Sequence, residues 1–218
     1  MKAFLLLASV SLSTASAQEA PVAQNASSHR TDWFCKAGYG VFVHYVSHIQ
    51  NNPECIQSLG RHTSWDECVR EFDVERFAQA MHEAGAGYVI FTMHQDDAFL
   101  PAPNATFNRI TGHKPGEVCS TRDLVLDLYA ALAKYNIPLM LYTTPHGLCA
   151  HHSEVLREYS KRYSNNVKGW WIDACYRAYG FSDEASGALA NALRAGNPDT
   201  IIAMNNGIEA HVQPNTPD

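Results

Sequence analysis

The residues best suited to chemistry lie where predicted strands end. They combine one well-placed carboxylate, several neutral hydrogen-bonding groups and a wide aromatic surface. Sugars need such sites, because their hydroxyls take paired donors and acceptors while the apolar C–H face of the ring stacks on indole or phenol. The sequence therefore predicts a sugar-binding site. Its strand-end residues are His44, Tyr45, His94, Gln95, Asp96, Asp97, Tyr142, Thr143, His146, Trp170, Trp171 and Asp173.

Asp173 is the candidate catalytic residue. The run Trp170-Trp171-Ile172-Asp173 places a carboxylate at the mouth of an otherwise apolar strand. A retaining glycosidase needs such a carboxylate to attack the anomeric carbon, and a second one about 5–5.5 Å away as acid and base. The structural alternative is that Asp173 caps the following turn or pairs with Arg177.

Strands and helices alternate along the chain, a pattern that predicts a parallel sheet with crossover helices. Amphipathic or apolar periodicity predicts helices over 74–84, 122–135, 154–163 and 184–195, and a long loop over 94–120. Short runs rich in β-branched and aromatic residues predict strands over 40–46, 88–93, 138–143, 169–174 and 200–204. In either parallel architecture the ligand lies at the carboxyl ends of the strands.

The periodicity fits two α/β folds, an open doubly wound sheet and an incomplete (β/α)8 TIM barrel. A full barrel typically takes about 250 residues, so a chain of this length falls short by roughly three strands. An open barrel would expose the strand edges at 40–46 and 200–204, and long apolar edges favour aggregation.

Five segments resemble motifs of the α-L-fucosidases, glycoside hydrolase family twenty-nine, in family order across 33–173. Residues 34–45 are similar to a first-strand motif that ends in a sugar-binding histidine, and residues 84–96 to a strand that runs into His-His-Asp-Gly-Phe. The other three similar segments are the helix start 122–125 (RDLV), the strand 139–143 (LMLYT) and the nucleophile motif 171–173 (WID). The resemblance selects the barrel: an incomplete (β/α)8 TIM-barrel-like fold with about five strands.

The resemblance implies hydrolysis of terminal α-L-fucosides with retention at the anomeric carbon, without cofactor or metal. The implied partner is a fucosylated oligosaccharide or glycoconjugate. The implied site residues are His44 and His94 on the fucose hydroxyls, Tyr142 and Trp171 as pocket walls, Asp173 as the nucleophile, and Trp65 and Glu67 from a pocket loop.

The chain departs from the family pattern in three places. Gln95 stands where the family has its second histidine, and glutamine can still hydrogen-bond a hydroxyl through both its donor and its acceptor. Asp97-Ala98 replaces the glycine before Phe99. In the family, an acid/base carboxylate comes from a later part of the barrel and a β-sandwich domain follows that part. We expect neither of these in this chain, where Glu209 is the one late carboxylate that could be a candidate.

The N-terminus has the order of a secretory signal peptide: Lys2, an apolar run over 3–12, and small residues ending at Ala17. The apolar run is shorter than the roughly 20 residues of a membrane-spanning helix, and no later segment reaches that length. We therefore expect a signal peptide over 1–17, a flexible segment over 18–30, a partial barrel over 31–218, and a secreted protein that does not bind a membrane.

Secretion would allow glycans and disulfides. Asn25 and Asn104 begin Asn-X-Ser/Thr sequons and are possible glycan acceptors. Six dispersed cysteines predict disulfides rather than a zinc site, with about 15 possible connectivities that the sequence leaves open. They are Cys35, Cys55, Cys68, Cys119, Cys149 and Cys175.

Charge and histidine spacing define the competing functions. A formal net charge of -6, with 17% charged residues, argues against nucleic-acid binding and disorder. A metal-dependent hydrolase could use His146, His151 and His152, but His44 and His48 lack the His-X-His spacing of such barrels. The remaining alternatives are a carbohydrate-binding protein that does not cleave, a truncated fucosidase-like protein, and a barrel completed by a second chain. The sequence leaves the oligomeric state open.

Overall fold

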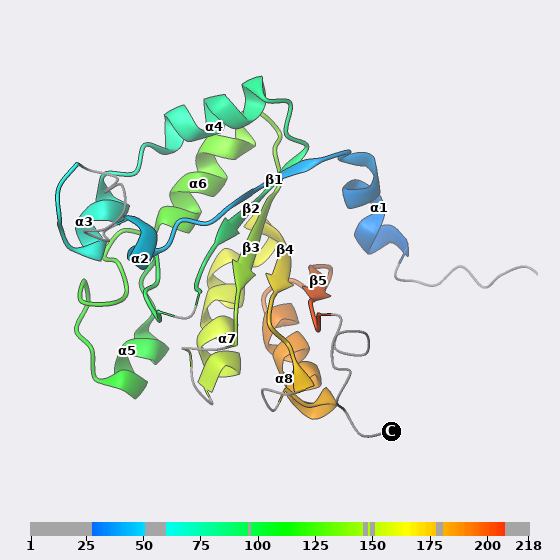
Figure 1. Cartoon of the computed structure of the whole chain (residues 1–218). Coiled ribbons are helices and arrows are strands. Elements are labelled where there is room, and N and C mark those ends of the chain that lie inside the picture. Colours follow the sequence, from blue (N-terminus) through cyan, green and yellow to red (C-terminus); the bar gives the residue numbers. More distant parts are fainter. Residues whose placement is uncertain are drawn as a thin grey trace, which may run out of the picture.

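The computed structural model describes residues 28–50, 60–95, 97–145, 148, 151–177 and 181–207. Five parallel strands form one sheet in the order β1-β2-β3-β4-β5 (Figure 1). Each strand therefore pairs with the next one along the chain, as in a (β/α) barrel, whereas a doubly wound sheet reverses its order. The predicted five-stranded, TIM-barrel-like α/β fold is confirmed. The strands are β1 (Gly40–Val43), β2 (Tyr88–Thr92), β3 (Leu139–Thr143), β4 (Val167–Ile172) and β5 (Ile201–Met204).

Strand side chains alternate between two faces. Val89, Phe91 and Leu141 point to the helices and belong to a large buried core. Ile90 and Tyr142 form a second, smaller cluster, with Trp171 packed against it. We call the surface that carries this second cluster the inner face of the sheet.

Four helices cover the other face of the sheet (Figure 1). Three of them begin at a side-chain cap: Asp73 accepts from Arg76, Asp123 from Leu126 and Ser182 from Ala185, in each case at the backbone N–H. These caps explain why the helices start within two residues of their predicted positions. The covering helices are α4 (Val74–Glu83), α6 (Leu124–Ala133), α7 (His152–Tyr163) and α8 (Asp183–Arg194).

β4 contains an irregularity that sets which residues face inward. Leu139 pairs with Val167, but the next residue, Met140, pairs with Gly169, so Lys168 is an extra residue in β4. Because of this bulge, Val167 and Trp170 both face the helices although they are three positions apart. We call it the Lys168 bulge.

The short helices were not predicted from the sequence. Periodicity is weak over one or two turns, and two of these elements, α3 and α5, instead begin at a side-chain cap, Ser64 and Asn104. Helix α5, for example, lies inside the predicted loop 94–120 between the Asn104 cap and Gly112, whose φ is 78°. The unpredicted helices are α1 (Ser28–Lys36), which begins before the expected domain start, α2 (Ser47–Gln50), α3 (Trp65–Arg70), α5 (Ala105–Thr111) and the 3-10 helix η2 (Ser164–Asn166).

Asn104 is a structural residue and not a glycan acceptor. Its side chain is 0% exposed. The amide oxygen accepts from the backbone N–H of Phe107 at 2.7 Å, and Nδ2, the atom that would carry a glycan, donates to the carbonyl of Val155 at 3.1 Å. The expectation of a glycan at this position is therefore wrong. Asn25, the first residue of the other sequon, lies outside the described residues.

We expect Asn104→Ala to lower the free energy of unfolding by roughly 2 kcal/mol, because it removes a helix cap and a second buried hydrogen bond. Urea denaturation measures the change. Thr106→Ala is the matched control, since it destroys the same sequon and keeps the cap. Equal losses in the two variants would mean that a glycan, and not the cap, stabilises this segment.

The predicted disulfides do not form among the described cysteines: no bond joins Cys35, Cys68, Cys119 and Cys175 to one another. Cys55 and Cys149 lie outside the described residues. Burial raises the pKa of the Cys119 thiol and of the Cys175 thiol to about 12. Within the described part of the chain, no helix is long and apolar enough to cross a membrane.

Cys119 and Cys175 should therefore resist iodoacetamide at pH 8 in the folded protein, because the thiolate is the reactive form and both thiols stay protonated well above that pH. Cys35 is exposed and should react. Peptide mass spectrometry gives the labelling at each site. Both buried thiols should react in urea without reductant, and failure to do so would show that they are oxidised.

Candidate functional site

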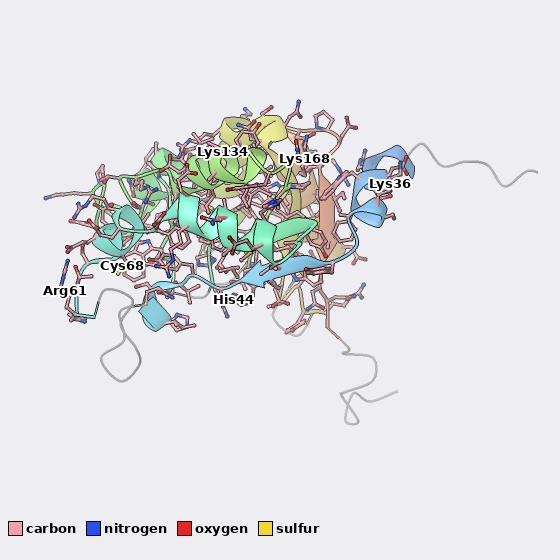
Figure 2. The ribbon with its side chains drawn as sticks, turned by 90° about the horizontal axis from the view of Figure 1, so that it is seen from above. Lys36, His44, Arg61, Cys68, Lys134 and Lys168 are labelled. Carbon is pink, nitrogen blue, oxygen red and sulfur yellow. The ribbon has the colours of Figure 1, made fainter. Side chains whose placement is uncertain are left out.

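Polar side chains on the inner face of the sheet lie close together where the strands end. Thr92 at the end of β2 donates to the carbonyl of Val43 at 2.8 Å, and its hydroxyl lies 3.2 Å from Nδ1 of His44. The His44 ring meets the Tyr142 ring edge to face, with centroids 4.9 Å apart at 86°. His44 lies on the opposite side of the sheet from Lys134, which follows α6 (Figure 2).

Asp173 is hydrogen-bonded at both carboxylate oxygens. The Tyr142 hydroxyl donates to Oδ2 at 2.9 Å, and Nδ2 of Asn205 donates to Oδ1 at 2.7 Å. The backbone N–H of Ala174 donates to Oδ1 at 2.8 Å. The alternative pairing with Arg177 is not formed, because Arg177 binds Asp183 at 3.1 Å. His44, Thr92, Tyr142, Asp173 and Asn205 thus form one contiguous set, which we call the strand-end group.

The backbone continues its ladder beyond the strands and fixes this group. Asp173 N–H donates to Thr143 O at 2.9 Å, and Asn205 N–H donates to Ile172 O at 2.7 Å. Between them Ala174 adopts a φ of 56°, in the left-handed region that residues with a Cβ rarely enter. Such strain persists only where surrounding bonds hold the chain, and it clusters at functional sites.

Aromatic rings form a wall beside the group. Phe42 on β1 is 44% exposed. Its ring centroid lies 4.7 Å from that of His44, 5.1 Å from Tyr142 and 6.3 Å from Trp171. An exposed apolar wall next to a hydrogen-bonded carboxylate is the combination that binds a sugar ring.

The structure places the other predicted strand-end residues differently. His94 is 1% exposed just past β2, and Gln95 is half-buried, so both stay predictions as ligands of a sugar. Tyr45 and Trp170 pack into the large core on the helix side, and the Tyr45 hydroxyl donates to Cys68 O at 2.8 Å. Thr143 is fully buried, Asp97 lies 3.3 Å from His48, and Asp96 and His146 fall outside the described residues.

Trp65 lies in the core and not beside the strand-end group. Its side chain is 4% exposed, its indole N–H donates to Leu100 O at 2.9 Å, and its ring packs on Tyr45 with centroids 5.5 Å apart. The N–H and the ring faces are thus engaged within the protein. These contacts anchor α3 to the core, and a role of Trp65 in substrate binding stays a prediction.

Glu67, from the same predicted pocket loop, is held as an anion. The guanidinium of Arg61 donates to it at 2.5 Å and the Thr63 hydroxyl donates to its other oxygen. The Arg61 bond, with a smaller contribution from Thr63, lowers the pKa of Glu67 to about 2. A general acid must carry a proton near the working pH, so Glu67 is unsuited to protonate a leaving group.

The described residues contain no group of three or more His, Cys, Asp or Glu side chains that could hold a metal ion. His151 instead lies 3.4 Å from Glu154, and the His152 ring packs near Phe181 at 6.0 Å. The third histidine of the metal alternative, His146, falls outside the described residues.

No family model and no curated protein matches the sequence, so the relatives come from solved structures. The endo-fucoidan hydrolase MfFcnA4 from glycoside hydrolase family 107 aligns over 82% of this chain and 34% of its own, with 15% identity and a TM-score of 0.61. The α-L-fucosidase AlfC from Lactobacillus casei aligns over 79% of this chain and 70% of its own, with 16% identity and a TM-score of 0.56. The chain shares the barrel fold of these glycosidases.

A bacterial fucosidase bound to an iminocyclitol inhibitor also matches, over 79% of this chain and 48% of its own, at 16% identity and a TM-score of 0.54. This chain therefore spans about a third of the length of the endo-fucoidan hydrolase and about half that of the bacterial fucosidase. The fold is common to both kinds of fucose-active glycosidase, so it does not select glycoside hydrolase family twenty-nine in particular.

Sequence reasoning missed Phe42 and Asn205. Both positions carried a signal, since Phe42 lies two residues before His44, and Asn205 two residues after the inner-face Ala203 that pairs with Trp171. Counting in steps of two from a known inner residue would have found them. Charge and motif patterns could not, because neither residue is charged and Asn205 follows its strand.

Proposed function

We propose that this chain carries the nucleophile of a fucose-active glycoside hydrolase that cleaves terminal α-L-fucosides with retention of configuration. The observation that carries the proposal is the carboxylate of Asp173, fixed at both oxygens beside an exposed aromatic wall. The fucose-active glycosidases that share the fold support this substrate class over other sugars.

In the proposed reaction the Asp173 carboxylate attacks the anomeric carbon and forms a covalent glycosyl-enzyme, which water then hydrolyses. Phe42 and Trp171 would stack on the apolar face of the sugar, and His44 would bind a hydroxyl, with Thr92 orienting its ring. The strand-end group has one carboxylate, so the acid/base must come from elsewhere. Glu209, the sequence-based candidate, lies outside the described residues.

The test is hydrolysis of a 4-nitrophenyl α-L-fucoside followed by NMR. Nitrophenolate leaves without a proton, so the first step needs no acid, and the missing base slows only the attack of water on the glycosyl-enzyme. We expect the α-anomer of fucose as the first product, since two displacements restore the configuration. The β-anomer would overturn the retaining mechanism, and equal turnover of 4-nitrophenyl α-L-rhamnoside would overturn the assignment of substrate.

A second candidate function is carbohydrate binding without cleavage, which the single carboxylate of the strand-end group favours. Calorimetry with L-fucose and fucosyl oligosaccharides separates the two: binding without nitrophenol release would support this second function.

We also propose that the protein is secreted, with 1–17 as signal peptide, which mass spectrometry of the mature N-terminus would test.

A further inference from the structure

The two oxygens of the Asp173 carboxylate have different partners. Oδ1 accepts two N–H groups, from Asn205 Nδ2 at 2.7 Å and from the Ala174 backbone at 2.8 Å. Oδ2 accepts the Tyr142 hydroxyl at 2.9 Å. A carboxylate oxygen offers about two lone-pair sites, so two donors fill Oδ1 while Oδ2 keeps one site open.

The amide of Asn205 is fixed in the orientation that this arrangement needs. Its Oδ1 accepts from the backbone N–H of Gly207 at 2.9 Å, so Nδ2 must face Asp173. Its backbone is held at both ends, because its N–H donates to Ile172 O at 2.7 Å and its carbonyl accepts from Cys175 N–H at 3.0 Å. Residues on both sides of Asp173 therefore hold Asn205, and Asn205 in turn holds the carboxylate.

We propose that Asn205 is the positioning residue of the nucleophile: it anchors Oδ1 of Asp173 and leaves Oδ2 as the oxygen that attacks the sugar. The inference rests on the proposed function. In the first step the Oδ2–C1 bond forms while the C1–O bond to the leaving group breaks. An aryl leaving group departs as a phenolate with the electron pair of that bond. With a glycosyl fluoride the C1–F bond breaks instead and fluoride takes the pair, so no proton donor enters this step in either case.

The experiment measures the rate of covalent labelling by 2-deoxy-2-fluoro-α-L-fucosyl fluoride, followed by intact mass. Asn205→Ala should slow labelling by roughly 10–10²-fold, the usual cost of misplacing a reacting group, and leave the reagent's half-saturation concentration nearly unchanged. Asn205→Asp should be slower still, because it keeps the shape but places a second carboxylate against Asp173. The matched control, Asn206→Ala, changes an exposed neighbour and should label like the wild type.

The Asp variant separates positioning from packing. If Asn205 only filled space, the isosteric Asn205→Asp would label normally, and this outcome would overturn the proposal. Thermal unfolding of each variant shows whether a slow rate reflects a lost fold, and a folded, slow Asn205→Asp supports the proposal.

A wild type that takes no label would count against the proposed function and not against the role of Asn205. NMR then decides the latter: one Asn205 side-chain amide proton, assigned by its absence in Asn205→Ala, should shift upfield in Asp173→Ala. An unchanged signal would show that Asn205 does not hold Asp173.

Discussion

Asp173→Ala should lower the rate of 4-nitrophenyl α-L-fucoside hydrolysis on the order of 10⁴-fold, equivalent to about 5.5 kcal/mol of transition-state stabilisation. The reason is that the covalent intermediate cannot form without the carboxylate, while the surrounding residues still bind the sugar. Asp173 is held by side chains from two other strand ends, so alanine removes the attacking group without removing a packing residue.

Azide gives this prediction a second readout. The small anion fits the space left by the carboxylate and should restore turnover of the alanine variant, with β-L-fucosyl azide as product, since one displacement inverts the configuration. Asp183→Ala is the matched control, because Asp183 is a 90% exposed carboxylate paired with Arg177. Wild-type activity in Asp173→Ala would exclude Asp173 as nucleophile.

Trp170→Ala should lower stability and Trp171→Ala should weaken sugar binding, although the two residues are adjacent. Trp170 is 2% exposed in the core beneath α7 and α8, so alanine should cost about 3–5 kcal/mol of unfolding free energy. Trp171 packs on the inner face, so alanine there should leave the fold intact and weaken fucose binding roughly tenfold through lost stacking.

Urea denaturation and fucose calorimetry on both variants give the comparison. The two substitutions delete the same side chain one position apart, so each serves as the control for the other. Equal losses of stability would contradict the assignment of the two tryptophans to opposite faces of β4.

The sheet could be predicted because its strands are apolar and its helices amphipathic. Leu139–Thr143, buried throughout, has the continuous apolar run of a strand covered on both sides. The neighbourhood of Asp173 was also predictable, since Tyr142 and Asp173 each end an inner-face series. The sequence did not predict which face of the sheet Trp170 lies on, because a position at a strand end does not distinguish the two faces of the strand.

The contacts that the sequence could not predict are those made between distant segments. Trp65 was predicted from the resemblance to belong to a pocket loop, whereas its indole N–H donates to Leu100 O, 35 positions away. Asn104 reads as a sequon because a three-residue pattern carries no information on burial, and its partner Val155 is 51 positions away. Such pairings depend on the folded chain, so local patterns misassign them.

The Lys168 bulge is a point at which β4 can change length without moving Asp173. Removing Lys168 would let Gly169 follow Val167 directly and would keep both pairs, Leu139 with Val167 and Met140 with Gly169, so Trp170 and Asp173 would keep their faces. A single-residue deletion between Gly169 and Asp173 would instead shift Asp173 by one position and turn its carboxylate toward the helices, because side chains of a strand alternate with a period of two.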